Sequence, residues 1–289
     1  MTLFKARWPG ILIWFLVGLL VGTTATALAV AYLFLNPRMR GIPKQMVVSG
    51  EGYTVIVSQN TARIKHPPIL WESRTKVKAV ALTFDDGPDP NYTPRILDIL
   101  KEKNVRATFF LVGREVEQHP DIVEREISEG HELENHSYSH PELEVETDAQ
   151  IQNEIVKGGE AIEKMTGKKP KYFRPPKGLV GGEVFTIANA NGYQVILWGI
   201  TIEHSASKTP PEEANRVLKA IEPGMIILAH DGRLNRIKTV EALPIIIDGL
   251  RAKGYKFLTL SALLRLDKPA GRGVRLKETR SLRKQGKAK

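Results

Sequence analysis

Two histidines lie four residues apart in the segment GHELENHSYSH, residues 130–140, of a chain that contains no cysteine. A spacing of four brings His136 and His140 to the same side of a helical turn. Imidazole is the commonest protein ligand of zinc and related metals. Without thiolates, any further ligand must supply oxygen or nitrogen. The pair also fits two ordinary surface or core histidines, so this segment alone is weak evidence for a metal site.

Two adjacent carboxylates, Asp85 and Asp86, lie in the segment TFDDGP, residues 83–88. Neighbouring side chains of an extended chain point to opposite sides, so one carboxylate can bind a metal while the other acts as a base. Two imidazoles and one carboxylate leave a coordination position open for water, as catalytic metal sites do. A bound metal then lowers the pKa of that water. An ordinary turn is the alternative interpretation of Asp-Asp-Gly-Pro.

These residues need a scaffold, and the chain alternates strand-like and helix-like segments. Seven apolar, β-branched or aromatic runs predict strands at residues 77–84, 107–112, 131–135, 171–173, 193–200, 225–229 and 256–260. The clearest helical patterns are residues 94–103 with Thr93 as N-cap, residues 148–165 closed by Gly167, and residues 239–253 closed by Gly254. This alternation predicts a parallel sheet, either doubly wound or closed as a barrel.

Four polar clusters follow predicted strands directly. TFDDGP ends the first strand, HSYSH the third, FRPPKG (residues 173–178) the fourth and LAHD (residues 228–231) the sixth. Loops at the carboxyl ends of parallel strands form the ligand and active sites of α/β folds. The four clusters are therefore expected to converge on one face of the domain.

The ordered motifs TFDDGP, GHELENHSYSH, FRPPKG and ILAHD resemble those of the polysaccharide deacetylase family, which is carbohydrate esterase family 4 or the NodB-homology domain. The resemblance covers about residues 77–264. Four motifs in the right order are far more specific than any one of them. The resemblance implies a distorted (β/α)7 barrel and a divalent metal, zinc first and cobalt second. It also implies hydrolysis of N-acetyl or O-acetyl groups on polysaccharides.

Carried over position by position, the resemblance implies that Asp86, His136 and His140 are metal ligands and that Asp85 is the general base. It implies that Arg174 holds this base by a charge-assisted pair. It implies further that His230 is the general acid that protonates the departing amine.

The resemblance also implies a set of substrate contacts. The backbone N–H near Lys177 would help to stabilise the tetrahedral oxyanion. Leu228 would line the small pocket for the acetyl methyl group. The substrate-binding residues implied in this way are Pro175, Pro176, Lys177, Leu228 and Trp198.

Two positions depart from the family pattern. After the fifth strand the family usually has an aspartate followed by Asp-Trp, whereas this chain has Thr201 and then His204. We expect His230 to lack the usual carboxylate support unless Glu203 or Asp231 replaces it. The second departure is Lys177, where the family usually has an aromatic residue or glycine, and it would bring a positive charge near the sugar.

The ends of the chain differ from its middle. Residues 11–35 form an uncharged, mostly apolar run of 25 residues, long enough to span a bilayer. We therefore expect a membrane anchor in residues 1–36, with a cleaved signal peptide as the alternative. Residues 37–75 are expected to form a stalk or linker, residues 76–266 the catalytic domain, and residues 267–289 a disordered basic tail.

Localisation and partners follow from these ends. We expect a single-pass cell-membrane protein with an extracytoplasmic catalytic domain, or a secreted protein. The basic tail is predicted to contact anionic wall polymers or lipid headgroups and not nucleic acid. This setting favours peptidoglycan N-acetylglucosamine as substrate. Chitooligosaccharides and acetylxylan are the alternatives, and a catalytically weakened, membrane-tethered glycan-binding module is an alternative of another class.

Overall fold

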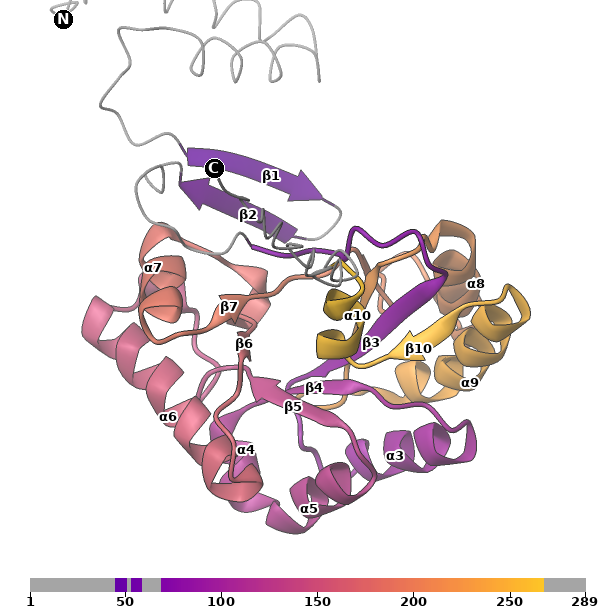
Figure 1. Cartoon of the computed structure of the whole chain (residues 1–289), viewed down its shortest axis with the longest axis horizontal. Coiled ribbons are helices and arrows are strands. Elements are labelled where there is room, and N and C mark those ends of the chain that lie inside the picture. The colour runs from indigo at the N-terminus through magenta and orange to yellow at the C-terminus, as the bar shows by residue number, and fades with distance from the viewer. Residues whose placement is uncertain (1–44, 51–52, 59–68, 268–289) are drawn as a thin grey trace, which may run out of the picture.

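The structure is a computed structural model that describes residues 45–50, 53–58 and 69–267 (Figure 1). The predicted anchor, residues 1–36, and nearly all of the predicted basic tail lie outside these ranges. The predictions made for those segments remain predictions.

A curled parallel sheet forms the centre of the domain. Its strands run in the order β7-β6-β5-β4-β3-β9-β8, and β10 also pairs with β3. The strands are β3 (Ala79–Asp85), β4 (Thr108–Leu111), β5 (Glu132–Asn135), β6 (Tyr172–Phe173), β7 (Gln194–Val195), β8 (Ile200–Thr201), β9 (Ile226–His230) and β10 (Lys256–Leu258). All of these pairs are parallel. The predicted parallel α/β class is confirmed.

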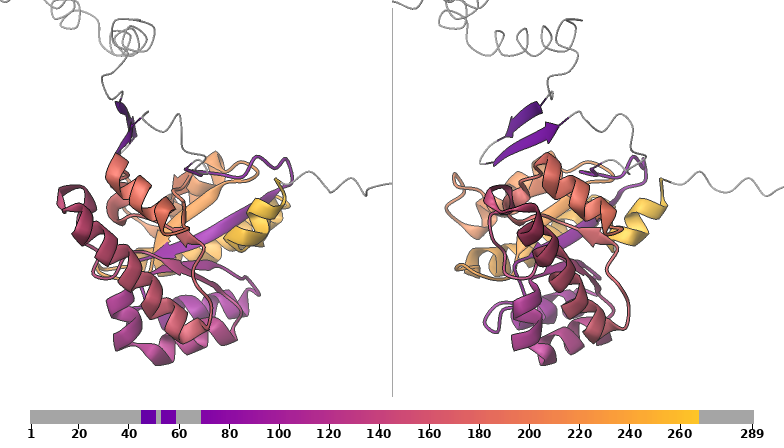
Figure 2. Two further views of the ribbon diagram at one scale, coloured as in Figure 1. Left: turned by 60° about the vertical axis from the view of Figure 1, so that its left-hand side comes forward. Right: turned by 90° about the vertical axis from the view of Figure 1, so that its left-hand side faces the viewer.

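Helices cover the outside of this sheet and connect its strands (Figures 1 and 2). The α-helices are α3 (Thr93–Glu102), α4 (Gly113–Gln118), α5 (Pro120–Ser128), α6 (Asp148–Thr166), α7 (Gly182–Ala190), α8 (Pro210–Ala220), α9 (Ile237–Ala252) and α10 (Leu260–Arg265). Two short 3-10 helices, η2 (Leu143–Val145) and η3 (Pro176–Gly178), lie in loops.

The predicted N-cap of the first helix is wrong. Helix α3 begins at Thr93, and Tyr92 is the N-cap. The Thr93 hydroxyl instead donates a hydrogen bond at 2.6 Å to Oδ2 of Asp231, the residue that directly follows β9. In contrast, α6 ends at Gly167 in the left-handed conformation, as its sequence predicts.

One predicted strand, residues 193–200, is divided into β7 and β8. Between them the chain leaves its neighbour β6, as the N–H of Leu197 donates to the carbonyl of Leu70 and the N–H of Gly199 donates to that of Ile226. The chain thus crosses from one edge of the curled sheet to the other. Single bridges of Leu70 to Ile196 and of Glu72 to Met225 lie across this opening.

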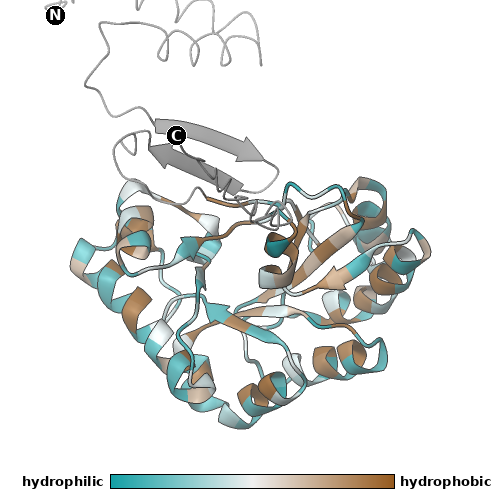
Figure 3. Ribbon diagram, viewed as in Figure 1, coloured by the Kyte–Doolittle hydropathy of each residue, from teal (hydrophilic) through white to brown (hydrophobic). Residues whose placement is uncertain are grey.

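Side-chain alternation along the strands produces two apolar layers. Val80, Leu82 and Phe84 of β3 point outward into the core beneath the helices. Ala79 and Ala81 point into the interior of the curled sheet. Because side chains alternate along a strand, Asp85 lies on the interior side with these alanines. Figure 3 shows apolar residues along the central strands and on the helix faces that cover them.

The segment before β3 has two parts. Strands β1 (Gln45–Gly50) and β2 (Tyr53–Ser58) form an antiparallel hairpin at one end of the domain (Figure 2). Nearer to β3, Ser73 and Thr75 are buried against the domain. The Ser73 hydroxyl donates to Oδ1 of Asp267 at 2.5 Å. The start of the domain at residue 76 and the linker before it remain a prediction.

The localisation prediction requires correction. None of the helices within the described residues is long and apolar enough to cross a membrane. The longest of them, α6 with 19 residues, carries charged side chains along its whole length. The prediction of a single-pass membrane protein is therefore contradicted for the described part of the chain. The predicted anchor lies outside it.

Candidate active site

Two carboxylates, Asp85 and Asp86, lie at the carboxyl end of β3 in different backbone conformations. Asp85 is the last residue of β3 and points into the curled sheet. Asp86 has a φ of 80°, so the chain is no longer extended there. A Cβ on Gly232 would lie 2.5 Å from the Asp86 carbonyl oxygen, which shows how tightly the loop after β9 packs against this turn. Both aspartates are buried.

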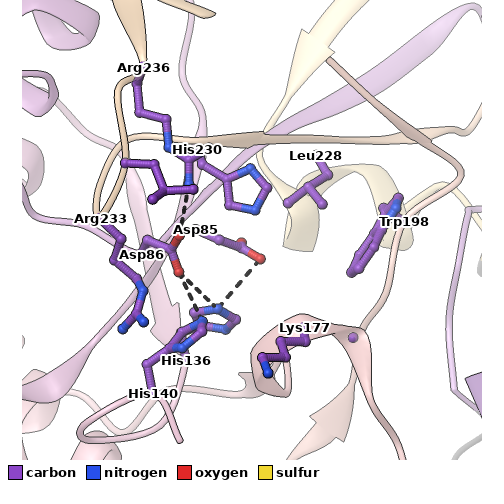
Figure 4. Close-up of a pocket in the computed structure, with 12 residues that line it drawn as sticks. Asp85, Asp86, His136, His140, Lys177, Trp198, Leu228, His230, Arg233 and Arg236 are labelled. Carbon is purple, nitrogen blue, oxygen red and sulfur yellow. Dashed lines mark hydrogen bonds and ion pairs between the residues drawn. The ribbon is translucent and has the colours of Figure 1, made fainter. Parts of the chain in front are cut away.

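Asp86, His136 and His140 converge, as their motifs predict. One potential ligand atom from each lies within 4.8 Å of the others. Oδ1 of Asp86 is 3.6 Å from Nε2 of His136 and 3.1 Å from Nε2 of His140 (Figure 4). This oxygen is buried and accepts no hydrogen bond. A buried carboxylate oxygen without a donor, facing two imidazole nitrogens, fits a cation-binding position.

The surroundings favour the ligand forms of these side chains. Nδ1 of His136 lies 2.7 Å from the Arg174 carbonyl oxygen, so Nδ1 carries the proton and Nε2 is left as a lone-pair donor. Burial lowers the pKa of His140 and so favours the neutral imidazole. For Asp86, burial raises the pKa, but the neighbouring imidazoles of His136 and His140 outweigh it and hold the pKa well below its ordinary value.

A residue that the sequence did not single out holds the other oxygen of Asp86. Arg236, the N-cap residue of α9, is buried, and its Nη2 lies 3.1 Å from Oδ2 of Asp86. Its Nε donates to the carbonyl of Gly232 at 2.8 Å. Arg236 thus links Asp86, which directly follows β3, to the loop after β9. Its position on a loop outside all four motifs gave no signal in the sequence.

Asp85 is held by a fully buried arginine, as predicted. Nη1 of Arg174 donates to Oδ1 of Asp85 at 2.6 Å and lies 2.9 Å from the Thr83 hydroxyl oxygen. Nη2 donates to the carbonyl of Leu197, in the crossing between β7 and β8. The guanidinium also lies 4.0 Å from the centre of the Phe110 ring. Burial lowers the pKa of Arg174, and the Asp85 carboxylate opposes this effect.

His230, at the end of β9, has a carboxylate partner despite the altered motif. Nδ1 of His230 lies 3.3 Å from Oε2 of Glu203. The other oxygen, Oε1, accepts from the backbone N–H of His230 at 3.0 Å and from the Thr239 hydroxyl at 2.8 Å. Burial lowers the pKa of His230, but Glu203 outweighs it, so the pKa lies above its ordinary value.

Glu203 itself is ionised. Burial raises its pKa, but the charge of His230 and hydrogen bonds from His230 and Thr239 bring the pKa to about 2. Thr201, where the family usually has aspartate, lies beside it, with its hydroxyl 3.3 Å from Oε2 of Glu203. Of the two replacements considered from sequence, Glu203 is the one in contact. Asp231 instead bonds to Thr93.

These side chains line one pocket at the carboxyl edge of the sheet (Figure 4). Its wall includes the predicted residues Lys177, Trp198 and Leu228, and also Arg233, Leu234 and Arg236, which the sequence did not single out. Pro175 and Pro176 are buried and are not among the lining residues. The two prolines therefore lie behind the pocket wall and shape the loop that carries Lys177.

The Lys177 loop is held tightly. Lys177 has a φ of 59° and Gly178 a φ of 69°. A Cβ on Gly178 would lie 2.5 Å from the Trp198 ring, so glycine allows the loop to pack on that ring. The ammonium of Lys177 lies 2.5 Å from Oε2 of Glu142, in the loop after His140.

The comparisons with known proteins agree with this site. The sequence model of the family described as polysaccharide deacetylase matches residues 72–196. A peptidoglycan-N-acetylglucosamine deacetylase of Bacillus cereus is 40% identical over 199 residues, which is 68% of this chain and 93% of the relative. The peptidoglycan-N-acetylmuramic acid deacetylase PdaA of Bacillus subtilis is 35% identical over 68% of this chain and 74% of that protein.

Solved structures give the same result. A crystal structure of a peptidoglycan N-acetylglucosamine deacetylase with a bound hydroxamate, an N-oxidanyl-benzamide, has a TM-score of 0.65 and 36% identity, over 68% of this chain and 92% of that one. A CE4 family pseudoenzyme from Bacillus anthracis has a TM-score of 0.63 and 33% identity, over 68% of this chain and 69% of that one. The chain belongs to the polysaccharide deacetylase family, and the predicted family is confirmed.

Proposed function

We propose that this protein is a metal-dependent hydrolase that removes acetyl groups from N-acetylated cell-wall polysaccharide. One observation carries the proposal. Asp85 and His230 line the same pocket as the Asp86–His136–His140 cluster, and each is paired with a side chain of opposite charge. A base and an acid that line one pocket together with a cation position suit hydrolysis of an amide.

Asp86, His136 and His140 would hold a divalent cation, with zinc preferred for a site of two imidazoles and one carboxylate. Such a cation polarises the acetyl carbonyl and activates water when it is bound. The fit rests on the unpartnered Oδ1 of Asp86 and on the lone pair that His136 presents. Cobalt is the alternative metal.

Asp85 takes the proton of the attacking water. Arg174, which also donates to the Thr83 hydroxyl, fixes one of its oxygens, and Oδ2 is 3.8 Å from Nε2 of His136, at the edge of the cation position. The backbone N–H of Lys177 stabilises the charge that develops on the acetyl oxygen. Leu228 contacts the acetyl methyl, and Trp198 forms the wall beside it.

His230 gives its proton to the departing nitrogen. Glu203 keeps the imidazole protonated, since it raises the pKa of His230. Transfer from His230 converts the nitrogen into a free amine as the carbon–nitrogen bond breaks and acetate leaves. The chemistry requires no covalent bond to the protein.

Peptidoglycan N-acetylglucosamine is the proposed substrate. The support is the identity of 40% to a relative of that name, of which this chain covers 93%. A chitooligosaccharide deacetylase of Bradyrhizobium is 33% identical, so chitooligosaccharides are the second candidate. The similarity to a CE4 pseudoenzyme keeps a glycan-binding module as the alternative of another class.

Acetate release decides between these functions. The whole chain is incubated with purified peptidoglycan and with chitooligosaccharides, with and without a chelator, and acetate is measured enzymatically. We expect release that stops with chelator and returns with added zinc. Binding to either glycan without acetate release at any metal concentration would identify a glycan-binding module.

A further inference from the structure

Two cationic side chains on the wall of the pocket have no role in the proposed reaction. Arg174 pairs with Asp85, and Arg236 pairs with Asp86, so each carboxylate of the pocket already has its guanidinium. Arg233 and Lys177 remain, and both line the pocket. They come from different loops and lie on opposite sides of His136 and His140 in Figure 4. The pocket therefore carries excess positive charge before any metal binds.

Arg233 lacks a partner within the part of the chain that the structure describes. It follows β9 at a φ of 67°, and its exposed side chain lines the pocket that also holds His140. No carboxylate among the described residues lies within ion-pair distance of it. An arginine presents a planar fork of donors that matches a carboxylate.

Lys177 has a partner that a ligand can replace. Its ion pair with Glu142 is solvent-accessible, with 56% of the lysine side chain and 42% of the glutamate side chain exposed. Exposed pairs of this kind contribute only about 0–1 kcal/mol. A carboxylate brought into the pocket can therefore compete with Glu142 for the ammonium.

We propose that Arg233 and Lys177 select an acidic glycan, namely one that carries a carboxylate next to the N-acetyl sugar in the pocket. This inference rests on the proposed deacetylase function and narrows its substrate class. Neutral chitooligosaccharides offer these cations no anion. A peptidoglycan strand offers carboxylates from two sources, its lactyl ethers and its peptides.

A matched pair of substrates tests the proposal. The first is a peptidoglycan glycan strand stripped of peptides, with free lactyl carboxylates, and the second is the same strand with those carboxylates converted to neutral methylamides. Acetate release gives kcat/KM for each with the zinc-loaded whole chain. We expect the acidic strand to be preferred by about tenfold, and the preference to shrink as salt rises. A strand that keeps its peptides, assayed alongside, tells lactyl from peptide carboxylates.

Variants that are expected to change the preference for the acidic strand in opposite directions sharpen the test. Arg233→Gln and Lys177→Gln should each lower the ratio of kcat/KM for the acidic over the neutral strand. Glu142→Gln should raise it, because it removes the competing carboxylate from Lys177. Lys164→Gln, an equivalent change at an exposed lysine of α6, is the control and should leave the ratio as in the wild type.

The outcomes separate this proposal from the proposed function. Equal kcat/KM for the two strands, with no change in the Arg233 and Lys177 variants, would overturn the selection of acidic glycans and leave deacetylation standing. Absence of acetate from every substrate would instead remove the proposed function. A peptide-bearing strand preferred over the stripped acidic strand would assign the carboxylate to the peptide.

Discussion

The two sides of the pocket that carry the proposed base and the proposed acid are built in contrasting ways. Asp85 lies at the end of β3 and is held by Arg174, a residue fully buried in the interior of the sheet. His230 lies at the end of β9 and is held by Glu203, in a loop at the sheet's edge that remains partly exposed. Both arrangements pair a proton-transfer group with an opposite charge.

The difference shows which part of the site can change its residues. Arg174 also donates to the Thr83 hydroxyl and to the carbonyl of Leu197, so it joins three segments. A substitute would have to make all of these contacts at once. Glu203 needs only to reach His230 from a loop. Glutamate has a longer side chain than aspartate, and Glu203 reaches His230 from two positions after Thr201. His230 therefore keeps a carboxylate partner although Thr201 replaces the aspartate that is usual in the family.

Asp85→Asn should have the largest effect, because it removes the base and keeps its shape. We expect kcat to fall by about 100- to 10,000-fold while zinc is still bound. Acetate release and elemental analysis of the same sample measure the two properties. Near-wild-type turnover in the zinc-loaded variant would show that the base is another group.

Glu203→Gln should have the next largest effect. Glu203 raises the pKa of His230, and the acid acts only when protonated, so activity is lost as pH rises through that pKa. Without the carboxylate the pKa falls, and the alkaline limb of the kcat/KM profile should move to lower pH. Glu183→Gln, at an exposed position of α7, is the control. An alkaline limb at the wild-type pH would show that Glu203 does not control the pKa of the general acid.

Arg236→Lys tests the link between Asp86 and the loop after β9. The change keeps the positive charge but loses the two-point contact with Asp86 and Gly232. We expect zinc affinity, measured by competition with a chelating dye, to weaken by about tenfold, as is usual for residues that orient metal ligands. Unchanged affinity in a folded variant would show that Asp86 is oriented without it.

Thr201→Val should have the smallest effect. The Thr201 hydroxyl lies 3.3 Å from Glu203, a long contact beside the shorter bonds from His230 and Thr239. The alkaline limb should shift much less than in Glu203→Gln. A shift of equal size would mean that Thr201 and not Glu203 controls the acid, and pH profiles of both variants make this comparison.

The sequence predicted the convergence of the site well, because motif residues at the ends of parallel strands must meet at one edge. Asp85, Asp86, His136, His140, Arg174 and His230 all lie together for this reason. The limits of most strands were also close to those observed, as in residues 225–229 for β9.

Contacts that depend on loop paths could not be predicted. Arg236 and Arg233 lie in the loop after β9, where no periodic pattern constrains the backbone. The division of residues 193–200 into two strands depends on hydrogen bonds to Leu70, more than a hundred positions earlier in the chain. Thr93 resembled an N-cap because its preference for that position is local, whereas its bond to Asp231 is a tertiary contact.

Zinc titration of the metal-free whole chain, with acetate release from peptidoglycan followed in the same samples, tests most directly whether one metal bound by Asp86, His136 and His140 supports deacetylation. Activity should rise in proportion to added zinc and reach its plateau at one equivalent. A His136→Ala, His140→Ala double variant should neither bind that equivalent nor release acetate. Full activity without metal, or one tightly bound zinc in the double variant, would show that these residues do not hold a catalytic metal.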